Sequence, residues 1–391
     1  MKIYIFLFVF TIFLFTSCKK DSWETENKSC TLTESINITY SKAAAIQSII
    51  DKYAKAGLPG ISIAIYSNEG FWASASGYAK IETKTLMQPC HLQYSQSVSK
   101  TYLAVAILKL YEQGKIKLDE KITTYLPESI ISKIKDADQV TVRMLLNHTS
   151  GIPEYNSQPA YVTYLLQHPL HTFSTMDYLN FIKGQSLQFT PGSKHQYTNT
   201  NYVLLALIGD QITGDHAKFI RDIIFVPLGL VNSFYREDEN YLNKPELVNS
   251  YWDRYSNGVI ENCSKMQQTN VASLIGDDGI IATPIDYIQF LKALFEGQIL
   301  SQATMNQMLE FVKNDPAKPY GYGLGIATDS FNGHIQYGHT GGGIGAACEL
   351  GYFKEKNTYF FLAINMGVSI DSPILKNAKN LQNEIYLVLT E

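Results

Sequence analysis

Residues 97–100 read Ser-Val-Ser-Lys, and they open an apolar stretch that runs to Gln113, just ahead of Gly114. Apolar residues recur at helical spacing through this stretch, which predicts a well-buried helix from Ser97 to Gln113. Residues three apart share one face of a helix, so we expect the Ser97 hydroxyl within reach of the Lys100 amine. A serine becomes a nucleophile when a base lies beside it, and a buried lysine can be that base. The spacing points to a catalytic pair, although it also occurs at ordinary helix starts.

Tyr197 and Asn199 form a second group, placed after the turn Thr190-Pro191-Gly192 and before a helical stretch that begins at Tyr202. A tyrosine near a lysine can pass protons, since the lysine stabilises its phenolate. An asparagine can hydrogen-bond a substrate amide. Tyr197 is therefore a third catalytic candidate and Asn199 a substrate-binding candidate. Taken singly, the tyrosine could equally be an exposed loop residue.

The run His339-Thr340-Gly341-Gly342-Gly343 lies between two predicted strands. Glycines allow a substrate backbone to approach an edge strand closely. His339 and Thr340 can contact a substrate carboxylate or carbonyl, so His339, Thr340, Gly341 and Gly342 are substrate-binding candidates. The alternative is a glycine-rich hairpin turn without a ligand. Nothing after the run has phosphate-loop spacing, which argues against a nucleotide site.

Strand-like stretches lie near both ends of the chain, and helical stretches fill its middle. The strand-like stretches are 60–66, 71–81, 322–327, 335–338, 347–353 and 358–364, and a helix is expected at 375–389. Short turns join the later strands, which indicates antiparallel pairing. We therefore predict an α+β fold of mixed α/β type. It consists of an antiparallel sheet flanked by helices and of a helical lobe. A cleft between lobes is where small-molecule sites usually lie.

The first residues are predicted to be an export signal rather than part of the fold. Lys2 precedes an apolar run over residues 3–16, which is shorter than the about 20 residues that span a bilayer. Residues 15–18, Phe-Thr-Ser-Cys, resemble the lipobox of bacterial lipoproteins. That resemblance implies cleavage before Cys18, a lipid anchor on Cys18 and a place in the bacterial cell envelope. A plain secretory signal is the alternative.

Composition limits the other partners. The formal net charge of −4 gives no support to nucleic-acid binding. If Cys18 is lipidated, four cysteines remain, and an exported protein can pair them in three ways or keep some as buried free thiols. They are Cys30, Cys90, Cys263 and Cys348. Their spacing matches no metal motif, and the oligomeric state is left open.

Taken in order, Ser-x-x-Lys, Tyr-x-Asn and His-Thr-Gly resemble the motifs of the penicillin-recognising serine hydrolases. The resemblance is to the branch that holds class C β-lactamases, D-alanyl-D-alanine carboxypeptidases and related esterases. Residues 145–152 are similar to that branch's LLxHTSGL segment, in which His148 and Ser150 are expected to be structural. Residues 57–60 and 201–205 agree with the branch as well. The likeness extends from about Lys42 to Leu389.

This resemblance implies an acyl-enzyme on Ser97, with no metal or organic cofactor. Lys100 and Tyr197 would relay the proton, and which of them is the base is left open. The backbone N–H groups of Ser97 and Gly342 would hold the oxyanion, while Asn199 and Thr340 would orient the substrate. The expected organisation is a signal peptide at 1–17, a lipid-anchored tether at 18–40 and the hydrolase domain at 41–391.

One departure from the family pattern bears on the substrate. Class C β-lactamases carry lysine where this chain has His339, which favours a carboxypeptidase-like or peptidase-like member. The expected substrates are D-amino-acid peptides such as D-alanyl cell-wall peptides. The alternatives are an esterase, a weak β-lactamase, or a non-enzymatic module that binds peptidoglycan or β-lactams. The adjacent Asp277 and Asp278 are expected to lie in a solvated loop rather than to bind a metal.

Overall fold

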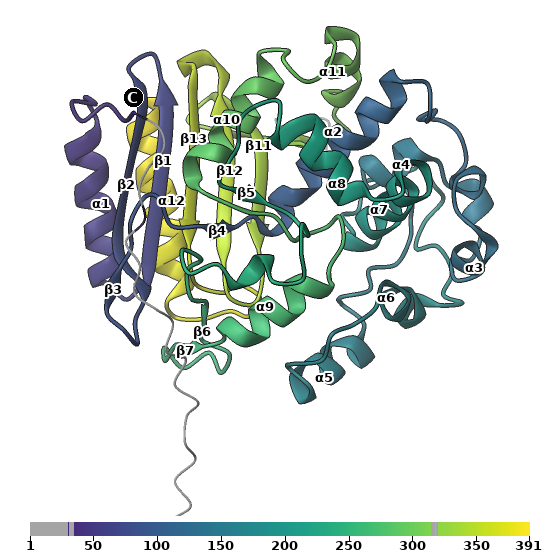
Figure 1. Cartoon of the computed structure of the whole chain (residues 1–391), viewed down its shortest axis with the longest axis horizontal. Helices are drawn as coiled ribbons and strands as arrows, with labels where there is room; N and C mark the ends of the chain where they lie inside the picture. The colour runs from purple at the N-terminus through teal and green to yellow at the C-terminus, as the bar shows by residue number, and fades with distance from the viewer. Residues whose placement is uncertain (1–29, 31–34, 314–316, 318–319) are drawn as a thin grey trace, which may run out of the picture.

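In the computed structural model, both ends of the chain contribute to one sheet (Figure 1). The structure describes residues 30, 35–313, 317 and 320–391. The sheet has eight strands in the order β3-β2-β1-β13-β12-β11-β10-β9, and every pairing in it is antiparallel. Its strands are β1 (Gly60–Ser67), β2 (Gly70–Lys80), β3 (Thr85–Leu86), β9 (Gly321–Tyr322), β10 (Ala327–Phe331), β11 (His334–Gly342), β12 (Ala347–Phe353) and β13 (Thr358–Ile364).

The two chain ends meet because β1 pairs along its length with β13, from Ile61 opposite Ile364 to Tyr66 opposite Tyr359. Alternate side chains of a strand point to opposite faces, so each of these central strands can be covered by helices on both sides. One face packs against α1 (Ala43–Lys55) and α12 (Leu375–Thr390). The other face packs against α10 (Pro284–Phe295). This face belongs to the core that continues into the helical lobe.

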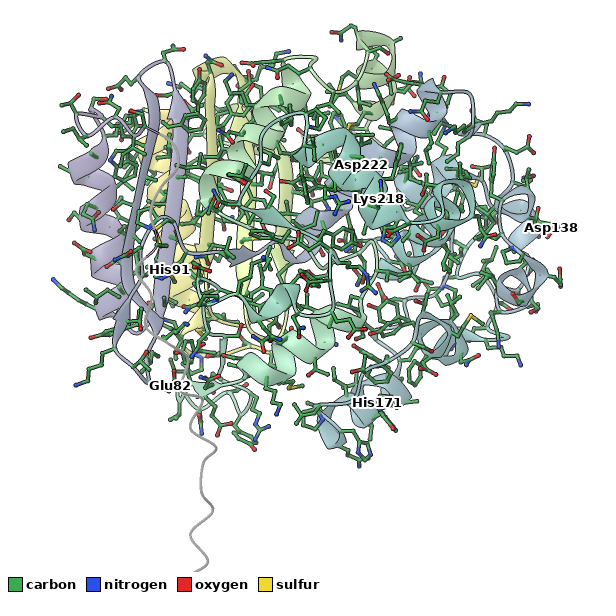
Figure 2. All side chains as sticks on the ribbon, viewed as in Figure 1. Glu82, His91, Asp138, His171, Lys218 and Asp222 are labelled. Carbon is green, nitrogen blue, oxygen red and sulfur yellow. A yellow bond between two sulfur atoms is a disulfide. The ribbon has the colours of Figure 1, made fainter. Side chains whose placement is uncertain are left out.

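The helical lobe lies beside the sheet and holds the middle of the chain (Figure 1). Its exposed groups, such as Asp138 and His171, lie at the outer surface (Figure 2). The remaining helices are α2 (Ser99–Glu112), α3 (Glu128–Ile131), α4 (Val142–Leu146), α5 (Pro159–Gln167), α6 (Thr175–Ile182), α7 (Asn199–Thr213), α8 (His216–Ile220), α9 (Ser264–Ser273) and α11 (Gln302–Met308). Short strands complete the fold: β4 (Gln93–Tyr94), β5 (Ser233–Phe234), β6 (Tyr251–Trp252), β7 (Glu261–Asn262) and β8 (Ile281–Ala282).

The predicted α+β fold is confirmed, since the antiparallel sheet, its flanking helices and the helical lobe are all present. Several details differ from the sequence expectations. Ser97 lies in a 3-10 helix, Gln96–Val98, and the α-helix begins two residues later at Ser99. The glycine run after His339 is not a turn, because β11 continues through Gly342 in register with β12. The expected strand at 322–327 is instead two strands, β9 and β10, with residues 323–326 between them, and the helices α3, α5 and α9 were not expected.

The N-terminal predictions fall mostly outside the described residues. The signal at 1–17, Cys18 and the start of the tether are among them. Residues 35–40 differ from a free tether, because the backbone N–H of Asn37 donates to Phe71 O and Tyr40 is buried. Within the described part of the chain, no helix combines the length and the apolar character needed to cross a membrane.

The structure resolves the cysteine alternatives. Cys30 and Cys90 form a disulfide across a sequence separation of 60 residues. Cys348 is a buried free thiol, as one alternative had it, and Cys263 is free and partly buried. The disulfide ties the N-terminal arm to the segment that leads into the Ser97 turn.

Candidate active site

The Ser97 hydroxyl lies beside the Lys100 amine. Lys100 Nζ donates to Ser97 Oγ at 2.9 Å and to the backbone carbonyl of Asp277 at 2.8 Å. The lysine side chain is 0% exposed, whereas Ser97 is partly exposed. The residue before the nucleophile, Gln96, has a positive φ of 46°, a strained conformation of the kind that clusters at functional sites. The 3-10 helix thus presents the hydroxyl at the surface of the core with its amine partner beneath it.

Tyr197 comes from the helical lobe, two residues before α7. Its hydroxyl is within hydrogen-bonding range of Lys100 and Ser97. The ring is 37% exposed, and its centroid lies 5.2 Å from Lys100 Nζ and 4.3 Å from the His148 ring. Burial of the hydroxyl raises the pKa of Tyr197, and Lys100 opposes that rise. The three catalytic candidates therefore converge, with a neutral phenol available as a proton donor.

The strand β11 brings the third motif to the same place. β10 pairs with β11 only as far as Gly338, whereas β12 pairs with it through Gly342. Residues 339–342 of β11 thus have one edge paired with β12 and one edge without a β10 partner. An unpaired edge can hydrogen-bond an extended substrate backbone.

His339 is buried within the site rather than open to it. Its Nε2 is 2.8 Å from Tyr322 Oη and its Nδ1 is 2.6 Å from the carbonyl oxygen of Thr340. A carbonyl only accepts, so Nδ1 carries the proton and Nε2 accepts from Tyr322. Burial and the charge of Lys100 lower the pKa of His339 to about 3, which keeps the ring neutral. Both ring nitrogens of His339 are already hydrogen-bonded. The ring therefore has no free nitrogen for the contact with a substrate carboxylate that the sequence predicted.

The glycines of β11 let this strand touch the nucleophile turn. A Cβ on Gly341 would lie 2.5 Å from Ser95 O and 2.7 Å from Gln96 Cβ, both impossible contacts. Gly342 is exposed and lines the same cavity as Ser97, while Thr340 is exposed and pairs across to Glu349. Gly342 and Ser97 thus line one cavity, and the assignment of their backbone N–H groups to an oxyanion hole stays a prediction.

A cavity of about 390 Å³ lies in front of Ser97, between the sheet and the helical lobe. Asn199 and Gly342 line it together with Ser97. Its apolar wall comes from both lobes, namely Tyr161, Val162, Leu165, Leu166, Trp252, Leu274, Ile344 and Ile370. A separate apolar cavity of about 270 Å³ lies between the sheet and α12 and does not include Ser97. The larger cavity is therefore the candidate substrate cleft.

The expectation of a solvated loop at Asp277 and Asp278 is wrong. Both residues are buried and line the cleft. Asp277 Oδ2 accepts from the Tyr155 hydroxyl at 2.8 Å, and the Asp277 backbone carbonyl holds Lys100. Local polarity suggested solvent, but burial here depends on the helical lobe that packs over the loop.

Glu154 was missed by the sequence reasoning. Its Oε2 accepts from the backbone N–H of Asn199 at 2.5 Å and from Asn199 Nδ2 at 3.1 Å. It thereby fixes the asparagine that was predicted to bind substrate. Its place two residues after the LLxHTSGL-like segment was the available signal.

His148 and Ser150 lie behind the site, in contacts that fit the structural role expected for them. Both are buried, and Ser150 Oγ donates to Asn201 Oδ1 at 2.7 Å. His148 Nδ1 accepts from the backbone N–H of Thr198 at 3.3 Å, in the segment that carries Tyr197. They link the segment before α5 to the start of α7.

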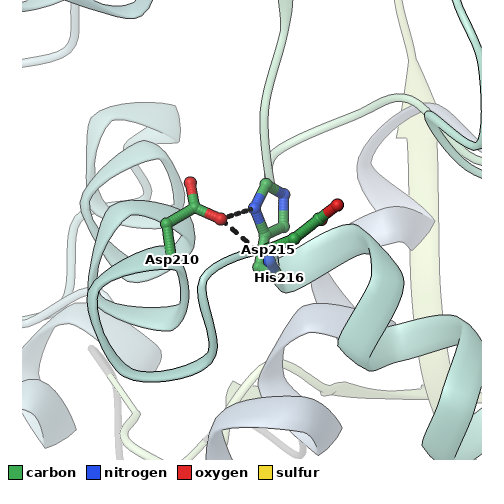
Figure 3. A group of neighbouring side chains, drawn as sticks. All are labelled: Asp210, Asp215 and His216. Atoms are coloured by element: carbon green, nitrogen blue, oxygen red, sulfur yellow. Dashed lines mark hydrogen bonds and ion pairs between the residues drawn. The ribbon is translucent and has the colours of Figure 1, made fainter.

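One cluster of possible metal ligands occurs among the described residues, away from this cleft (Figure 3). It joins the end of α7 to α8. His216 Nδ1 is 2.7 Å from Asp210 Oδ1, and its Nε2 is 2.9 Å from the Tyr235 hydroxyl. Asp215 caps α8 by accepting from the backbone N–H of Lys218. Since both histidine nitrogens and the Asp215 side chain serve the helix junction, the cluster is explained by the fold.

This fold, with a serine, a lysine and a tyrosine at one cleft, defines a penicillin-recognising serine hydrolase. The chain belongs to the beta-lactamase family, whose family model matches residues 46–381. Penicillin-binding protein 4* of Bacillus subtilis (strain 168) is 26% identical over 340 residues, covering 82% of this chain and 72% of that protein. The putative penicillin-binding protein PbpX of the same strain is 26% identical over 290 residues, covering 74% of this chain and 67% of that protein.

Solved structures agree. The D-amino acid amidase from Ochrobactrum anthropi SV3, complexed with L-phenylalanine amide, is 25% identical with a TM-score of 0.76, covering 89% of this chain and 98% of that one. A D-stereospecific amidohydrolase from Streptomyces sp. is 25% identical with a TM-score of 0.73, covering 86% of this chain and 97% of that one.

Proposed function

We propose that this serine hydrolase cleaves amide bonds of D-amino-acid compounds, either peptides such as D-alanyl cell-wall peptides or simple amides, through an acyl-enzyme on Ser97. The observation that carries the proposal is the 2.9 Å hydrogen bond between Lys100 Nζ and Ser97 Oγ at the wall of a cleft that Tyr197 also reaches. The similar D-amino acid amidase and the D-stereospecific amidohydrolase support the substrate class.

The proposed reaction begins with attack of Ser97 Oγ on the substrate carbonyl carbon. The serine proton passes to the Lys100 and Tyr197 pair, which returns a proton to the leaving amine. The backbone N–H groups of Ser97 and Gly342 receive the developing oxyanion, an interaction worth about 3 kcal/mol in comparable sites. Water then attacks the ester carbonyl and gives a proton to the same pair of side chains, which returns a proton to Ser97 Oγ as the ester bond breaks and the acid product is released.

The substrate backbone is proposed to lie along the open edge of β11 at residues 339–342. Asn199, held by Glu154, would donate from its amide to the acyl group. His339 would act indirectly, by holding Tyr322 against the Tyr197 ring. Because Gly341 already touches the nucleophile turn, the edge and the serine are fixed relative to each other.

Intact-mass spectrometry after exposure to penicillin, with Ser97→Ala as the control, tests this assignment. A persistent adduct on the wild type alone is the expected result. Hydrolysed penicillin without an adduct would instead identify a β-lactamase. If neither occurs, an ester panel decides between an esterase and a binding module. A binding module would keep both its binding of cell-wall peptide and its full biological activity after Ser97→Ala, and that result would overturn an enzymatic role.

We also propose that the protein is exported and anchored to the envelope through Cys18. The Cys30–Cys90 disulfide supports an oxidising compartment, because such bonds persist outside the reducing cytosol. Expression in a bacterium followed by membrane fractionation tests the anchor. Cys18→Ser is expected to move the protein from the membrane pellet to the soluble fraction, and an unchanged distribution would contradict the proposal.

A further inference from the structure

The cleft wall holds carboxyl groups without a matching cation. Asp277 and Asp278 line it, and no lysine or arginine does so among the described residues. The nearest cation, Lys100, lies beneath the nucleophile and already donates to Ser97 and to the Asp277 backbone. Glu154 adds a third carboxylate behind Asn199.

Asp277 keeps an unused acceptor at this wall. Its side chain is 3% exposed, and its Oδ2 takes the Tyr155 hydroxyl at 2.8 Å. Its Oδ1 is buried and has no hydrogen-bond partner. A buried carboxylate oxygen without a partner costs free energy, so its presence in a cleft points to a donor on the ligand.

Burial disfavours the ionised forms of these carboxyl groups in the absence of a ligand. Burial raises the pKa of Asp277, and burial beside Asp277 raises the pKa of Asp278 to about 7. Burial likewise raises the pKa of Glu154. The charge of Lys100 opposes all three shifts without removing them. A cation bound between these groups would lower their pKa values and stabilise their ionised forms.

The same wall is unfavourable for a free substrate carboxylate. His339 is neutral with both ring nitrogens in use, so it offers no charge to such a group. An anion entering the cleft would meet the Asp277 and Asp278 carboxylates instead. A C-terminal carboxylate, which a carboxypeptidase substrate must carry, therefore has no cation to bind on this wall.

We propose that Asp277 and Asp278 form an ammonium subsite, so that the preferred acyl group is an amino acid with a free, protonated α-amine. This deepens the proposed function and rests on it. The α-amine is attached to the carbon next to the attacked carbonyl, so it must lie close to Ser97. Asp277 meets that requirement, because its backbone and Ser97 Oγ bind the same Lys100 amine. The enzyme would then release N-terminal D-residues or act on D-amino-acid amides.

A matched pair of substrates tests the subsite on the wild-type protein. D-Leucine p-nitroanilide and N-acetyl-D-leucine p-nitroanilide differ only in the charge and bulk of the amine. We expect kcat/KM for the free amine to exceed that for the acetylated compound by about tenfold or more, the strength of a hydrogen bond to a charged group. Equal or faster cleavage of the acetylated compound overturns the proposal.

Two variants then assign the preference to the residues. Asp277→Asn and Asp278→Asn keep the side-chain shape and remove the charge, and each is expected to lower the ratio of the two kcat/KM values about tenfold. Asp138→Asn, at an exposed position far from the cleft (Figure 2), is the control. A ratio that stays at the wild-type value in both cleft variants overturns the assignment.

The same measurements distinguish an error in the proposed function from an error in the ammonium subsite. If neither p-nitroanilide is cleaved and penicillin is neither bound to Ser97 nor hydrolysed, the proposed cleavage of D-amino-acid amides fails and the subsite falls with it. If penicillin acylates Ser97 while neither p-nitroanilide is cleaved, or only the acetylated one is, the subsite alone is refuted.

Discussion

The position of Lys100 depends on its surroundings more than on its place in the sequence. The amine is fully buried and donates hydrogen bonds to Ser97 Oγ and to the Asp277 backbone carbonyl. The first acceptor is the candidate nucleophile, and the second belongs to the backbone that positions the lysine. Such a lysine cannot turn to solvent without leaving a buried carbonyl unpaired. Its position is therefore fixed before any substrate arrives, as its proposed part in proton transfer requires.

Lys100→Met tests this residue with little change of shape. Methionine fills the space but cannot take the serine proton, so the rate of acylation by penicillin should fall by about 10²- to 10⁴-fold. Lys109→Met is the control, because Lys109 lies on the same helix α2 and binds Glu112 at the partly exposed side. Acylation rates from time-resolved intact mass decide, and a variant that acylates at the wild-type rate would remove Lys100 from the mechanism.

His339 predicts a pH dependence of stability. The folded chain keeps it neutral with a pKa of about 3, whereas an unfolded histidine protonates below pH about 6.5. The unfolded state then binds the extra proton, so this contribution is complete above pH 6.5 and is lost as the pH falls toward 3. Between pH 6 and 4, urea unfolding should show wild-type stability falling more steeply than that of His339→Gln, by up to about 1.4 kcal/mol per pH unit. Parallel curves would contradict the assignment.

At the scale of elements, the contact between β11 and the nucleophile turn joins the two halves of the site. Gly341 sits against the Ser95 backbone, whereas Gly343 sits against the end of the Gln96 side chain. Backbone cannot move aside as a side chain can. The two glycines therefore differ in what a methyl group would displace.

Gly341→Ala and Gly343→Ala form a matched pair on this contact. The Gly341 Cβ would lie 2.5 Å from Ser95 O, so the turn must shift. A misplacement of about 1 Å can cost about 10²-fold in rate, and we expect a loss of that order in the rate of penicillin acylation. In Gly343→Ala the Gln96 side chain can rotate away, so the loss should be several-fold smaller. Equal rates in the two variants would argue against the contact as the device that positions Ser97.

The sequence predicts correctly those elements whose bounds depend only on residues adjacent in the chain. Strands β12 and β13 begin and end at the predicted residues, because alternating or continuous apolar runs end at polar turns. The length of β11 was underestimated, since glycine has low strand propensity and only pairing with β12 extends the strand to Gly342. Of these extra residues, Gly342 lines the cleft, whereas Thr340 lines the separate cavity beside α12.

The part of the site that escaped prediction is the part made by tertiary burial. Ser97, Lys100 and Tyr197 stand in recognisable motifs, and the structure brings them together. Asp277 and Glu154 carry no local sign of burial, because the groups that bury them come from elsewhere in the chain. The same holds for the Cys30–Cys90 pairing, which sequence left as one of several possibilities.

At the scale of the whole molecule, the cleft exists only when both lobes are in place. The sheet supplies β11, the helical lobe supplies Tyr197 and α5, and the Ser97 turn lies at their junction. The cleft wall combines Val162, Leu165 and Leu166 of α5 with Trp252 and Ile370. A cavity of about 390 Å³ with this lining is larger than the methyl group of alanine needs.

The size of the apolar wall predicts a preference for bulky apolar acyl groups. D-Leucine p-nitroanilide buries three more carbon atoms than D-alanine p-nitroanilide, at about 0.8 kcal/mol for each buried methylene, so kcat/KM should favour leucine by about tenfold or more. Leu166→Ala should reduce this preference, because Leu166 lines the cleft from an exposed position that the core does not need. Leu170→Ala is the matched control, equally exposed but outside the cleft lining. If the two p-nitroanilides are cleaved with equal kcat/KM, the apolar wall does not contact the acyl side chain. The wall would then recognise the leaving group of the substrate instead.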